Sequence, residues 1–349
     1  MCTEIGVLVS VPLWELTMSS IKDVARLAGT STSTASRVIA KNGPVKAETR
    51  ERVLKAIEML DYKPNLLASG LRAKSGRLIG LILPESIHFD FGFFIQSISG
   101  ICMQYDMGLI IGNHHNDPEL ESKLFDDFYS RNIDGLIISP ASDASLLGKR
   151  LKNSLGKVVL IDREIANSNC SSVTLDNYKA GYLIGKFLIS KGHRKIACIT
   201  GPNHISISRD RTIGFRDALK ESNYYLDDNF VFEGNFNYDS SVDAIDAFVQ
   251  KPNFKDITAL WAENDVMAVG ALKELHKLGF NVPDDIALAG MDGTDISLLS
   301  IPSITTISQP FGEMAAKAVD LLLHPVSSEP VKVKFEPVLI PRESTDRIL

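Results

Sequence analysis

The apolar positions near the start of the chain recur at the spacing of a helix. They stand at i, i+3, i+4 and i+7, which predicts an amphipathic helix with one buried face. Ser20 is placed to cap this helix, with Asp23 three residues later, and Gly29 is placed to end it in a tight turn. The apolar residues of this pattern are Ile21, Val24, Ala25 and Ala28.

A second pattern of the same kind follows directly after the turn. Ser31 can cap a helix that runs to about Ala40. At about 100° per residue, its polar side chains and one guanidinium fall on an outward arc, opposite an inward arc. Two short helices joined by a glycine-containing turn form a helix-turn-helix. The outward arc holds Thr32, Ser33, Ser36 and Arg37, and the inward arc holds Thr34, Ala35 and Val38.

An outward face of this composition fits the major groove of DNA. Arg can bond guanine through two hydrogen bonds, and Ser or Thr can bond several base edges or contact a thymine methyl. A solvated face on a small helical pair is the alternative. A third apolar repeat predicts a helix over about 47–60, and the three-helix unit that results favours the DNA-binding interpretation.

Charge is distributed unevenly along the chain. Residues 19–77 hold twelve Lys or Arg and five Asp or Glu, a net charge of +7, whereas the whole chain carries −6. Residues 1–18 contribute −2, so residues 78–349 carry −11. A basic head on an acidic body is expected of a protein that binds nucleic acid, because phosphate neutralisation supplies most of the non-specific affinity.

The two helical segments also carry a resemblance to known proteins. The stretch IKDVARLAG at 21–29, followed by STSTASRV at 31–38, resembles the N-terminal signature of the lactose-repressor (LacI/GalR-type) family of bacterial transcriptional regulators. The motif is long and without gaps, so it is specific. The resemblance covers essentially all of residues 19–345. It implies a helix-turn-helix DNA-binding domain at 19–63, a hinge helix or linker at 64–77 and an effector-binding domain at 78–345.

The resemblance implies roles for individual residues of the head and the hinge. In the family the hinge folds as a helix when the dimer meets its operator, and a leucine, here Leu71, wedges into the minor groove. The residues expected to contact bases are Thr32, Ser33, Arg37 and Leu71, and those expected to hold phosphates are Ser31, Thr34, Asn42, Tyr62 and Asn65.

Two residues depart from the family pattern. Gly70 stands where a helix-compatible residue is more common, and Gly costs roughly 1 kcal/mol relative to Ala inside a helix. We therefore expect the hinge to depend on DNA contact for its order, and a plain linker at 62–77 is the alternative. Lys46 stands at a helix start where the family commonly has a capping Ser.

From Leu78 onward the pattern changes to short, wholly apolar runs that alternate with helical stretches. Strands of this kind indicate parallel sheets with both faces covered by helices. Such sheets bind ligands beyond the carboxyl ends of their strands. We therefore predict an α/β body in two halves after an all-α N-terminal domain. The predicted helices of the body include 93–106, 118–130, 144–153, 178–191, 209–221 and 265–278.

For this body the resemblance implies a Rossmann-like periplasmic-binding-protein type I fold with parallel sheets. Its two lobes would be joined by three crossovers and would close on a ligand by hinge motion. The crossovers are expected near 173–177, 305–309 and 335–338. Lobe 1 is expected at about 78–174 and 308–335, and lobe 2 at about 177–305 and 336–345.

Polar residues at strand ends, together with one arginine and three aromatic residues, are candidates for binding an effector between the lobes. Short acidic and amide side chains with a forked guanidinium suit the hydroxyls of a sugar, and an aromatic ring can stack on its apolar face. Each has a plainer alternative as a helix cap, a core residue or a structural ion pair, and Asp265 is interpreted as a cap. Placement and residue type give Asp162, Arg211, Phe236, Asn264 and Asp292 as candidates, and the resemblance to the family implies the same residues together with Phe93 and Phe94.

Further departures from the family bear on the effector class. Gly293 replaces an acidic residue that is common in the family. Ile205 and Ile207 occupy a loop where purine-responsive relatives carry polar groups, which disfavours a nucleobase. A sugar, sugar acid or sugar phosphate is the expected effector class.

Other signals indicate no further chemistry. His114 and His115 with Asp117 lack additional ligands at metal-binding spacing, so a solvated turn is expected there. Neither G-x-S-x-G nor G-x-x-x-x-G-K-[ST] occurs in the sequence. We therefore predict that the protein is not an enzyme and uses neither a cofactor nor a metal ion.

Composition limits the cellular setting. No run of eighteen apolar residues occurs, so no transmembrane helix is predicted, and four scattered cysteines fit a reduced cytoplasmic protein. The apolar run at 5–13 lacks a basic flank and a cleavage site, which argues against a secretion signal. We expect translation to start at Met18, with residues 1–18 a non-structural extension.

The sequence thus predicts a DNA-binding transcriptional regulator, a repressor that acts as a homodimer on a pseudo-palindromic operator. A small effector, most simply a sugar, would control its affinity for double-stranded DNA. The alternative is a sugar-binding transport or chemoreceptor component with the same two-lobed body. That alternative requires a signal peptide and no basic head, and this chain has the reverse.

Overall fold

The computed structural model describes residues 19–40, 42–63, 77–85, 89–151, 156–325 and 329–346. The chain divides into two compact units, Met1–Gly76 and Arg77–Leu349. Hinge residues 64–76, which include Asn65 and Leu71, lie outside the described residues, as does the extension at 1–18.

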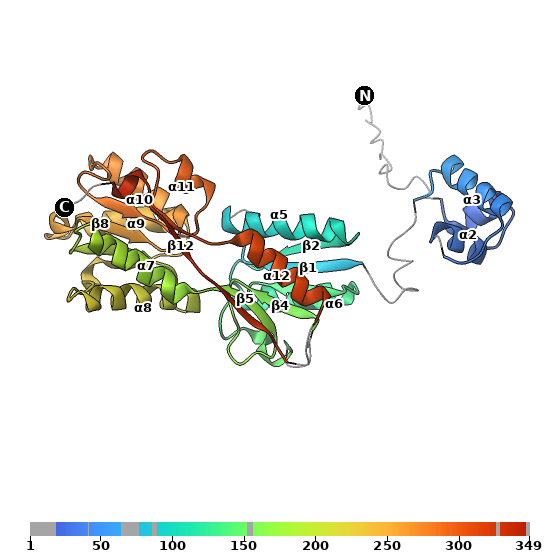
Figure 1. The fold of residues 1–349 in the computed structure, drawn as a ribbon, viewed down its shortest axis with the longest axis horizontal. Coiled ribbons are helices and arrows are strands. Elements are labelled where there is room, and N and C mark those ends of the chain that lie inside the picture. The colour runs from blue at the N-terminus through green and yellow to red at the C-terminus, as the bar shows by residue number, and fades with distance from the viewer. Residues whose placement is uncertain are drawn as a thin grey trace, which may run out of the picture. The chain divides into compact units, whose positions relative to one another are not determined.

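The first unit is a bundle of three short helices (Figure 1): α1 (Ile21–Leu27), α2 (Thr32–Ile39) and α3 (Ala47–Met59). Ser20 and Asp23 form the predicted capping box at α1, in which the Ser20 N–H donates to Asp23 Oδ2 at 2.9 Å. The inward faces meet in a small core built around Val24, Ala35 and Val53. The predicted helical periodicity is confirmed, with the ends shifted by about one residue.

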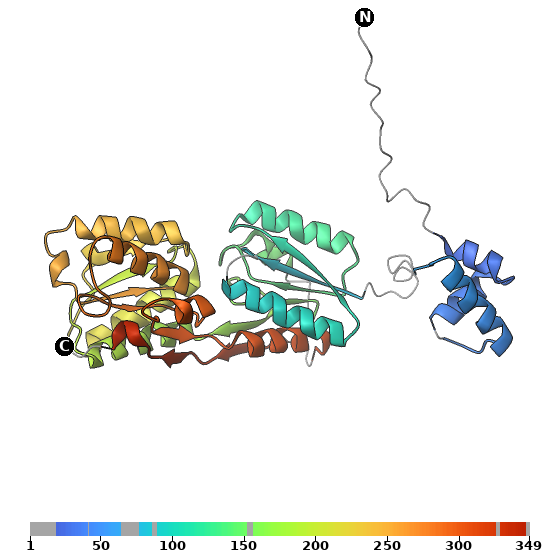
Figure 2. The same cartoon turned by 90° about the horizontal axis from the view of Figure 1, so that it is seen from above.

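The second unit contains two α/β lobes, which Figures 1 and 2 show from two directions. In lobe 1 the described residues form a parallel six-stranded sheet in the order β11-β5-β4-β3-β1-β2. Its strands are β1 (Leu78–Leu83), β2 (Gly108–Asn113), β3 (Gly135–Ile138), β4 (Val158–Ile161), β5 (Ser171–Leu175) and β11 (Lys332–Phe335).

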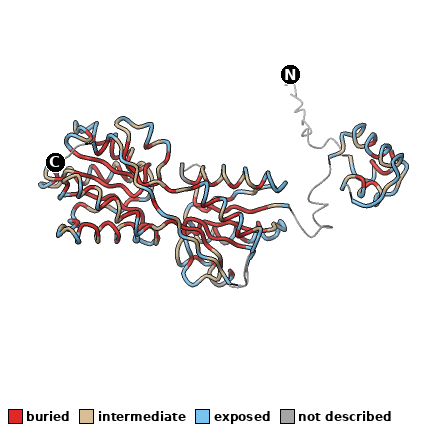
Figure 3. The backbone as a smooth tube through the Cα atoms, viewed as in Figure 1, coloured by how far each residue is buried: buried red, intermediate tan, exposed pale blue. Residues whose placement is uncertain are grey.

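The inner strands β1, β3 and β4 of lobe 1 are buried on both faces, as their apolar sequences predict, whereas the edge strands β2 and β11 are partly exposed. On one face, Leu81 and Ile137 pack against α5 (Phe89–Gln104) and α12 (Phe311–Leu323). On the other face, Ile82 packs with side chains of α6 (Pro118–Ser130). Figure 3 shows this burial as continuous red along the strands.

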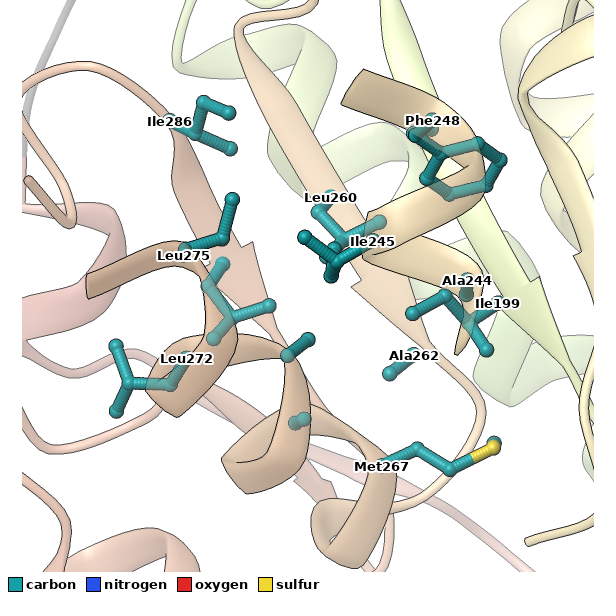
Figure 4. Packing of buried hydrophobic residues seen from close by; sticks show 14 of the residues in the cluster. Ile199, Ala244, Ile245, Phe248, Leu260, Ala262, Met267, Leu272, Leu275 and Ile286 are labelled. Atoms are coloured by element: carbon teal, nitrogen blue, oxygen red, sulfur yellow. The ribbon is translucent and has the colours of Figure 1, made fainter. Parts of the chain in front are cut away.

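In lobe 2 the described residues form a parallel four-stranded sheet in the order β7-β6-β8-β9. Its strands are β6 (Ile196–Thr200), β7 (Val231–Glu233), β8 (Ala259–Ala262) and β9 (Ala287–Ala289). One face packs on α9 (Tyr238–Val249) and α10 (Asp265–Lys277), where Ile245, Phe248 and Leu275 meet Leu260 (Figure 4). The other face packs on α7 (Asn177–Ser190) and α8 (Ser206–Glu221).

The chain passes between the lobes in three places. It leaves β5 of lobe 1 and enters α7 of lobe 2, and it returns through β10 (Thr306–Ser308) into α12. It crosses again from β11 to β12 (Val338–Ile340), which pairs antiparallel with β10. Lobe 2 also contains the short helix α11 (Asp295–Leu299) and 3-10 turns at Asp228–Phe230, Phe254–Asp256 and Glu343–Thr345.

One predicted helix of the body is wrong. Residues 144–153 do not form an α-helix, since a 3-10 turn covers only Leu146–Lys149 and residues 152–155 lie outside the description. Ser145 caps this turn and also bonds the buried carboxylate of Glu121, which fixes the segment to α6. Leu147 and Leu151 are buried, so the apolar spacing reflects packing in an irregular segment.

Helices α7 and α8 approach each other so closely that glycine is needed at the contact. A Cβ added at Gly181 would lie 1.9 Å from Arg211 O, and one added at Gly214 would lie 1.9 Å from Tyr178 O. Gly185 meets Ala218 on the same seam, at 2.7 Å from an added Cβ. The glycines therefore determine where α8 lies against α7.

Candidate functional site

The outward face of α2 carries the predicted DNA-contacting side chains. Thr32, Ser33 and Arg37 are exposed, while Ala35 and Val38 are buried against the other helices. Their opposite burial follows from the helical period, because residues three and four apart share a face. The three side chains therefore form one solvent-facing surface of small hydroxyls and a guanidinium.

Local hydrogen bonds fix the beginning of α2. Ser31 is the N-cap, and its Oγ accepts from Thr34 N–H at 3.1 Å and lies 2.9 Å from Thr34 Oγ1. Thr34 is half-buried, as its place on the inward arc predicts. Of the other expected phosphate contacts, Asn42 is exposed and Tyr62 packs partly on the core of the head. Lys46 is the N-cap of α3 and makes no side-chain capping bond, in line with its departure from the family pattern.

A second candidate site is a cavity of about 160 Å³ between the two lobes of the second unit. Residues at the carboxyl ends of strands line it, together with the start of α8, as expected for parallel sheets. Lobe 1 contributes Pro84, Glu85, Phe91, His115, Asn116, Asp162 and Arg163. The other lining residues are Ile207, Arg211, Asn235, Phe236, Asn237, Asn264, Asp292 and Gln309.

The wall from lobe 1 is polar and charged. Asp162 lies at a backbone φ of 66°, and its Oδ2 accepts from Ser139 Oγ at 3.3 Å. Burial raises the pKa of Asp162, and the charges of Arg163 and Arg211 oppose that shift. The buried Arg163 donates to Asn116 Oδ1 at 2.7 Å and to Pro140 O at 3.2 Å. These bonds hold an amide and a guanidinium at the pocket surface.

Arg211 and Asp292 form the charged part of the opposite wall. Arg211 Nε donates to Asn177 Oδ1 at 2.8 Å, and its guanidinium lies 3.8 Å from Asp292 Oδ1. Asp292 Oδ1 also accepts from Gln309 Nε2 at 2.7 Å. Gln309 Oε1 is buried and has no hydrogen-bond partner among the described residues. An acceptor is thus available beside a fixed ion pair.

A hydrogen bond joins the side chain of Asn264 to the backbone of Phe236. Asn264 Nδ2 donates to Phe236 O at 2.8 Å, and Asn264 Oδ1 caps α10 by accepting from Met267 N–H at 2.8 Å. The residue thus has both the predicted place in the pocket and the alternative role of a helix cap. Phe236 has a φ of 57°, and its ring lies where a side chain at Gly201 would be.

Two predicted aromatic residues do not line the pocket. Phe94 is buried in the lobe 1 core, and Phe93 stacks on Phe311 with ring centroids 5.6 Å apart. Phe91 lines the pocket instead. Helix α5 begins at Phe89, before the predicted start at 93, so the helical phase brings a different phenylalanine to the pocket.

The interpretation of Asp265 as a helix cap is wrong, because Asn264 is the N-cap of α10 and Asp265 is the first residue of that helix. Its carboxylate accepts from Thr294 N–H at 2.7 Å and from Thr306 Oγ1 at 2.7 Å, which ties the loop after β9 to β10. The solvated turn expected at His114 and His115 is found only in part. His115 is exposed, whereas His114 is buried and its ring bonds Ser139 O at 2.9 Å, which gives it a structural role. Burial lowers the pKa of His114 to about 4. Within the described residues, no cluster of His, Cys, Asp or Glu has the arrangement of a metal site.

A carboxylate bridges the lobes beside the pocket. Asp143 lies in lobe 1, and its Oδ1 accepts from Ser206 N–H of α8 in lobe 2 at 3.0 Å. It also pairs with Arg209 of α8. The N-cap residue Ile205 supplies no side-chain bond, so Asp143 caps α8 from the other lobe. Burial alone would raise the pKa of Asp143, but the hydrogen bonds from Arg209 and Ser206 outweigh it and lower the pKa.

Several pocket residues escaped sequence reasoning. Arg163, Asn235 and Asn237 stand next to predicted residues or helix starts, and the position of Arg163 directly after a strand-end Asp was an available signal. Gln309 lies at an expected crossover and its sequence context gives no sign of a pocket role. Ile207 belongs to α8 rather than to a loop, because that helix begins at Ser206.

Comparisons with known proteins cover both units. Residues 20–65 match the family model described as bacterial regulatory proteins, lacI family, and residues 186–345 match a periplasmic binding protein-like domain. The chain is 32% identical over 342 residues to the HTH-type transcriptional repressor PurR of Vibrio vulnificus, across 95% of this chain and 100% of that repressor. It is 31% identical over 313 residues to catabolite control protein A of Priestia megaterium, across 89% of this chain and 94% of that protein.

Two solved structures are similar over the same extent. A lac repressor dimer bound to operator and the anti-inducer ONPF matches with a TM-score of 0.84 and 25% identity, over 94% of this chain and 99% of that chain. A complex of the transcriptional regulator CelR with cellobiose matches with a TM-score of 0.69 and 27% identity, over 93% of this chain and 99% of that chain.

Proposed function

The chain belongs to the lacI family of bacterial regulatory proteins, and we propose that it represses transcription as a homodimer on a pseudo-palindromic operator. An effector bound between its lobes would control this repression. The family's relatives named above are DNA-binding transcription regulators and not enzymes, as the lack of a catalytic motif predicted. Because the DNA that it would bind lies in the cytoplasm of a bacterium, we assign the protein to that compartment.

The exposed polar face of α2 is the observation that carries the DNA-binding part of the proposal. Thr32, Ser33 and Arg37 point to solvent on a helix whose other face is buried, in a basic segment. Such a face can enter the major groove and contact base edges. Ser31, Thr34, Asn42 and Tyr62 would hold phosphates around it, with Asn65, while Leu71 would wedge the central step.

The cavity between the lobes supports the effector part of the proposal. Asp162, Arg211, Asn264 and Asp292 offer donors and acceptors from both lobes, and the ring of Phe236 offers a stacking surface. Such a lining suits a compound rich in hydroxyl groups. The similarity to the CelR–cellobiose complex points the same way, so a sugar or sugar derivative is the effector class that we propose.

An exposed apolar patch supports the homodimer. Leu298, Leu299 and Ile301 follow one another at α11 and after it, with exposed fractions of 56%, 77% and 86%. Exposed apolar side chains that are neighbours in the chain suit a contact with a second protein, and this supports an association surface on lobe 2. A two-fold dimer would bring two heads to two half-sites, and the lac repressor similar to this chain is itself a dimer on its operator.

Control of DNA binding would follow from movement of the lobes. A ligand that contacts both lobes stabilises one angle between them, and the three connections between the lobes are the places where that angle can change. The coupling is reciprocal, so an effector that weakens operator binding is itself bound more weakly on DNA by the same factor.

The test is selection of fragments from the native genome by the purified full chain at fixed salt. The selection is repeated with cellobiose, other sugars, sugar phosphates and a nucleobase added singly. We expect enrichment of a pseudo-palindrome, and we expect one sugar or sugar derivative to change that enrichment. Recovery of sequence-independent, salt-sensitive DNA under every condition would contradict the operator proposal, and a response to the nucleobase alone would contradict the sugar class.

A further inference from the structure

A buried glutamate lies directly behind the lobe 2 wall of the pocket. Glu263 follows β8 immediately, precedes the pocket residue Asn264, and has no exposed surface. Its carboxyl group accepts three hydrogen bonds. Gly201 N–H and Ser208 Oγ donate to Oε2 at 2.8 and 2.6 Å, and Thr212 Oγ1 donates to Oε1 at 2.7 Å.

These three donors belong to the two segments that carry the pocket wall. Ser208 and Thr212 lie on α8 on either side of Arg211, whose guanidinium donates to the backbone oxygen of Glu263 at 2.7 Å. Gly201 directly follows β6. The side chain and the main chain of Glu263 therefore fix both α8 and the Arg211 side chain relative to β8.

Gly201 in turn determines where the ring of Phe236 lies. A Cβ added at Gly201 would stand 2.0 Å from Cζ of that ring, so the ring rests on the glycine backbone. The hydrogen bond from Gly201 N–H to Glu263 holds that backbone in place. One carboxyl group thus supports the stacking surface and the arginine of the same pocket wall.

We propose that Glu263 is a positioning residue of the pocket, and that gain or loss of a proton on its carboxyl group adjusts Phe236 and Arg211 together. The inference rests on the proposed function in one respect, namely that this pocket holds the effector. Titration of Glu263 gives the pocket a response to pH that does not depend on which effector is bound.

The hydrogen-bond pattern accommodates both protonation states. The carboxylate accepts all three bonds, and in the protonated group Oε1–H can donate to Thr212 Oγ1 while Oε2 still accepts from Gly201 and Ser208. Between the two states the Thr212 hydroxyl reverses. The bonds from Gly201 and Ser208 also lose their ionised acceptor and weaken on protonation, which loosens the hold of Glu263 on the backbone beneath Phe236 and on α8. Burial raises the pKa of Glu263 to about 7, although the bonds from Gly201 and Ser208 and the charge of Arg211 favour the ionised form.

Charged and titratable groups surround Glu263, and they include Arg216 of α8 and Asp265 of α10, whose pKa is raised by burial. Arg211 approaches from α8 and is itself paired with Asp292 from the loop after β9. Cys198 on β6 is buried, and burial with the nearby Glu263 raises the pKa of its thiol well above the usual value. Asn177 from α7 contacts Arg211 and is neutral at any pH.

The test follows Gly201 by nuclear magnetic resonance in full-length protein labelled with ¹³C,¹⁵N-glycine, without effector or DNA. The ring of Phe236 shifts the Gly201 α protons, and the amide of Gly201 senses the carboxyl group. The variants are Glu263→Gln, which keeps a neutral acceptor, Glu263→Ala, and the control Glu274→Gln, a buried glutamate of α10 that bonds Lys277. Phe236→Leu identifies the Gly201 signal.

In the native protein we expect the Gly201 amide signal to move with one inflection near pH 7. Glu263→Gln should keep the ring-induced shift and lose the inflection, Glu274→Gln should keep both, and Glu263→Ala should lose the ring-induced shift. An inflection that persists in Glu263→Gln, or its absence from the native protein, would overturn the proposal even if Glu263→Ala fails to fold. If the spectra behave as expected while no compound changes operator binding, the effector proposal fails and the positioning role stands.

Discussion

The outward face of α2 and the pocket between the lobes are assembled in opposite ways. On α2 the side chains are exposed, and the hydrogen bonds that shape the helix start stay within three residues, from Ser31 to Thr34. In the pocket the charged side chains of Asp162, Arg211 and Asp292 are buried, and their hydrogen-bond partners are distant along the chain. Arg211 bonds Asn177 and the backbone of Glu263, which are 34 and 52 positions away.

This difference determines how each surface tolerates change. A face built from local bonds can exchange its side chains and keep the fold, because little else rests on them. A wall built from distant partners is coupled to the packing of its whole lobe, because loss of one partner leaves buried polar groups unsatisfied. Substitutions in the head should therefore alter recognition, and substitutions behind the pocket should alter stability and recognition together.

The largest effect is expected at the α7–α8 contact that supports the pocket wall. A Cβ in Gly214→Ala would lie 1.9 Å from Tyr178 O, so the helices must separate, at a cost of about 3 kcal/mol in the free energy of unfolding. Urea denaturation of the full chain measures it. Gly100→Ala is the matched control, since nothing lies within 4 Å of its Cβ. Equal stability of the two variants would contradict the close contact.

Arg37→Ala should show how the α2 face differs from the pocket wall, because it is expected to change the recognition of DNA without changing the stability of the fold. Loss of a guanidinium from the groove face should cost about 2 kcal/mol at one base position and relax specificity there. Quantitative binding to operator variants at fixed salt measures this loss, with Arg26→Ala on α1 as the control. A uniform loss across all sequences would make Arg37 a phosphate contact instead.

Asp143→Ala should loosen the bridge between the lobes and cost about 1 kcal/mol, because Arg209 is 44% exposed and solvent screens the pair. Since the pKa of Asp143 is lowered, its stabilisation is complete above the unfolded-state pKa of about 4 and is lost as the pH falls through the lowered value. Denaturation over a range of pH, together with hydrogen exchange of the Ser206 amide, measures both effects.

The control for that bridge is Asp228→Ala, which removes the partner of Arg216 within lobe 2. It should leave exchange at Ser206 unchanged. If Ser206 exchanges at the same rate in Asp143→Ala as in the native protein, the carboxylate does not cap α8.

The smallest effect is expected at the start of α3. Lys46 makes no capping bond, so Lys46→Ser should add roughly 0.5–1 kcal/mol to the stability of the head. The unfolding temperature of the three-helix head measures the gain in stability. Ser31→Ala, which removes an existing cap from α2, is the opposing control and should lose a similar amount. A Lys46→Ser variant no more stable than the native head would show that the position is satisfied by other means.

The sequence predicted best what depends on neighbours in the chain. The three helices of the head and the buried parallel strands could be predicted from the pattern of apolar residues. Apolar residues recur about every 3.6 residues along a helix with one buried face, and they run without interruption along a strand that is covered on both sides. The segment 144–153 was predicted as a helix from similar spacing and is a 3-10 turn, because Ser145 is bound to Glu121 of another helix. Periodicity alone does not distinguish a helix from an irregular segment that buries the same residues.

The residues that line the pocket could be predicted from the sequence only in part. Asp162, Arg211, Asn264 and Asp292 were predicted and line the cavity, since strand ends gather at one edge of a parallel sheet. Phe91 was missed because the phase of α5 depends on where that helix begins. Glu263 was missed because its three donors are spread over β6 and α8, and no spacing in the sequence brings them together.

The glycine seam between α7 and α8 has a consequence for genetics. Every missense codon that replaces a glycine adds at least a Cβ, and at Gly181 and Gly214 that atom collides with a backbone oxygen. A saturating mutational screen for repression should therefore find both positions intolerant to all changes, although neither lines the pocket nor lies in the head. In a collection of loss-of-function alleles, substitutions at these two glycines should therefore be as common as substitutions at ligand contacts, and the cause is steric collision alone.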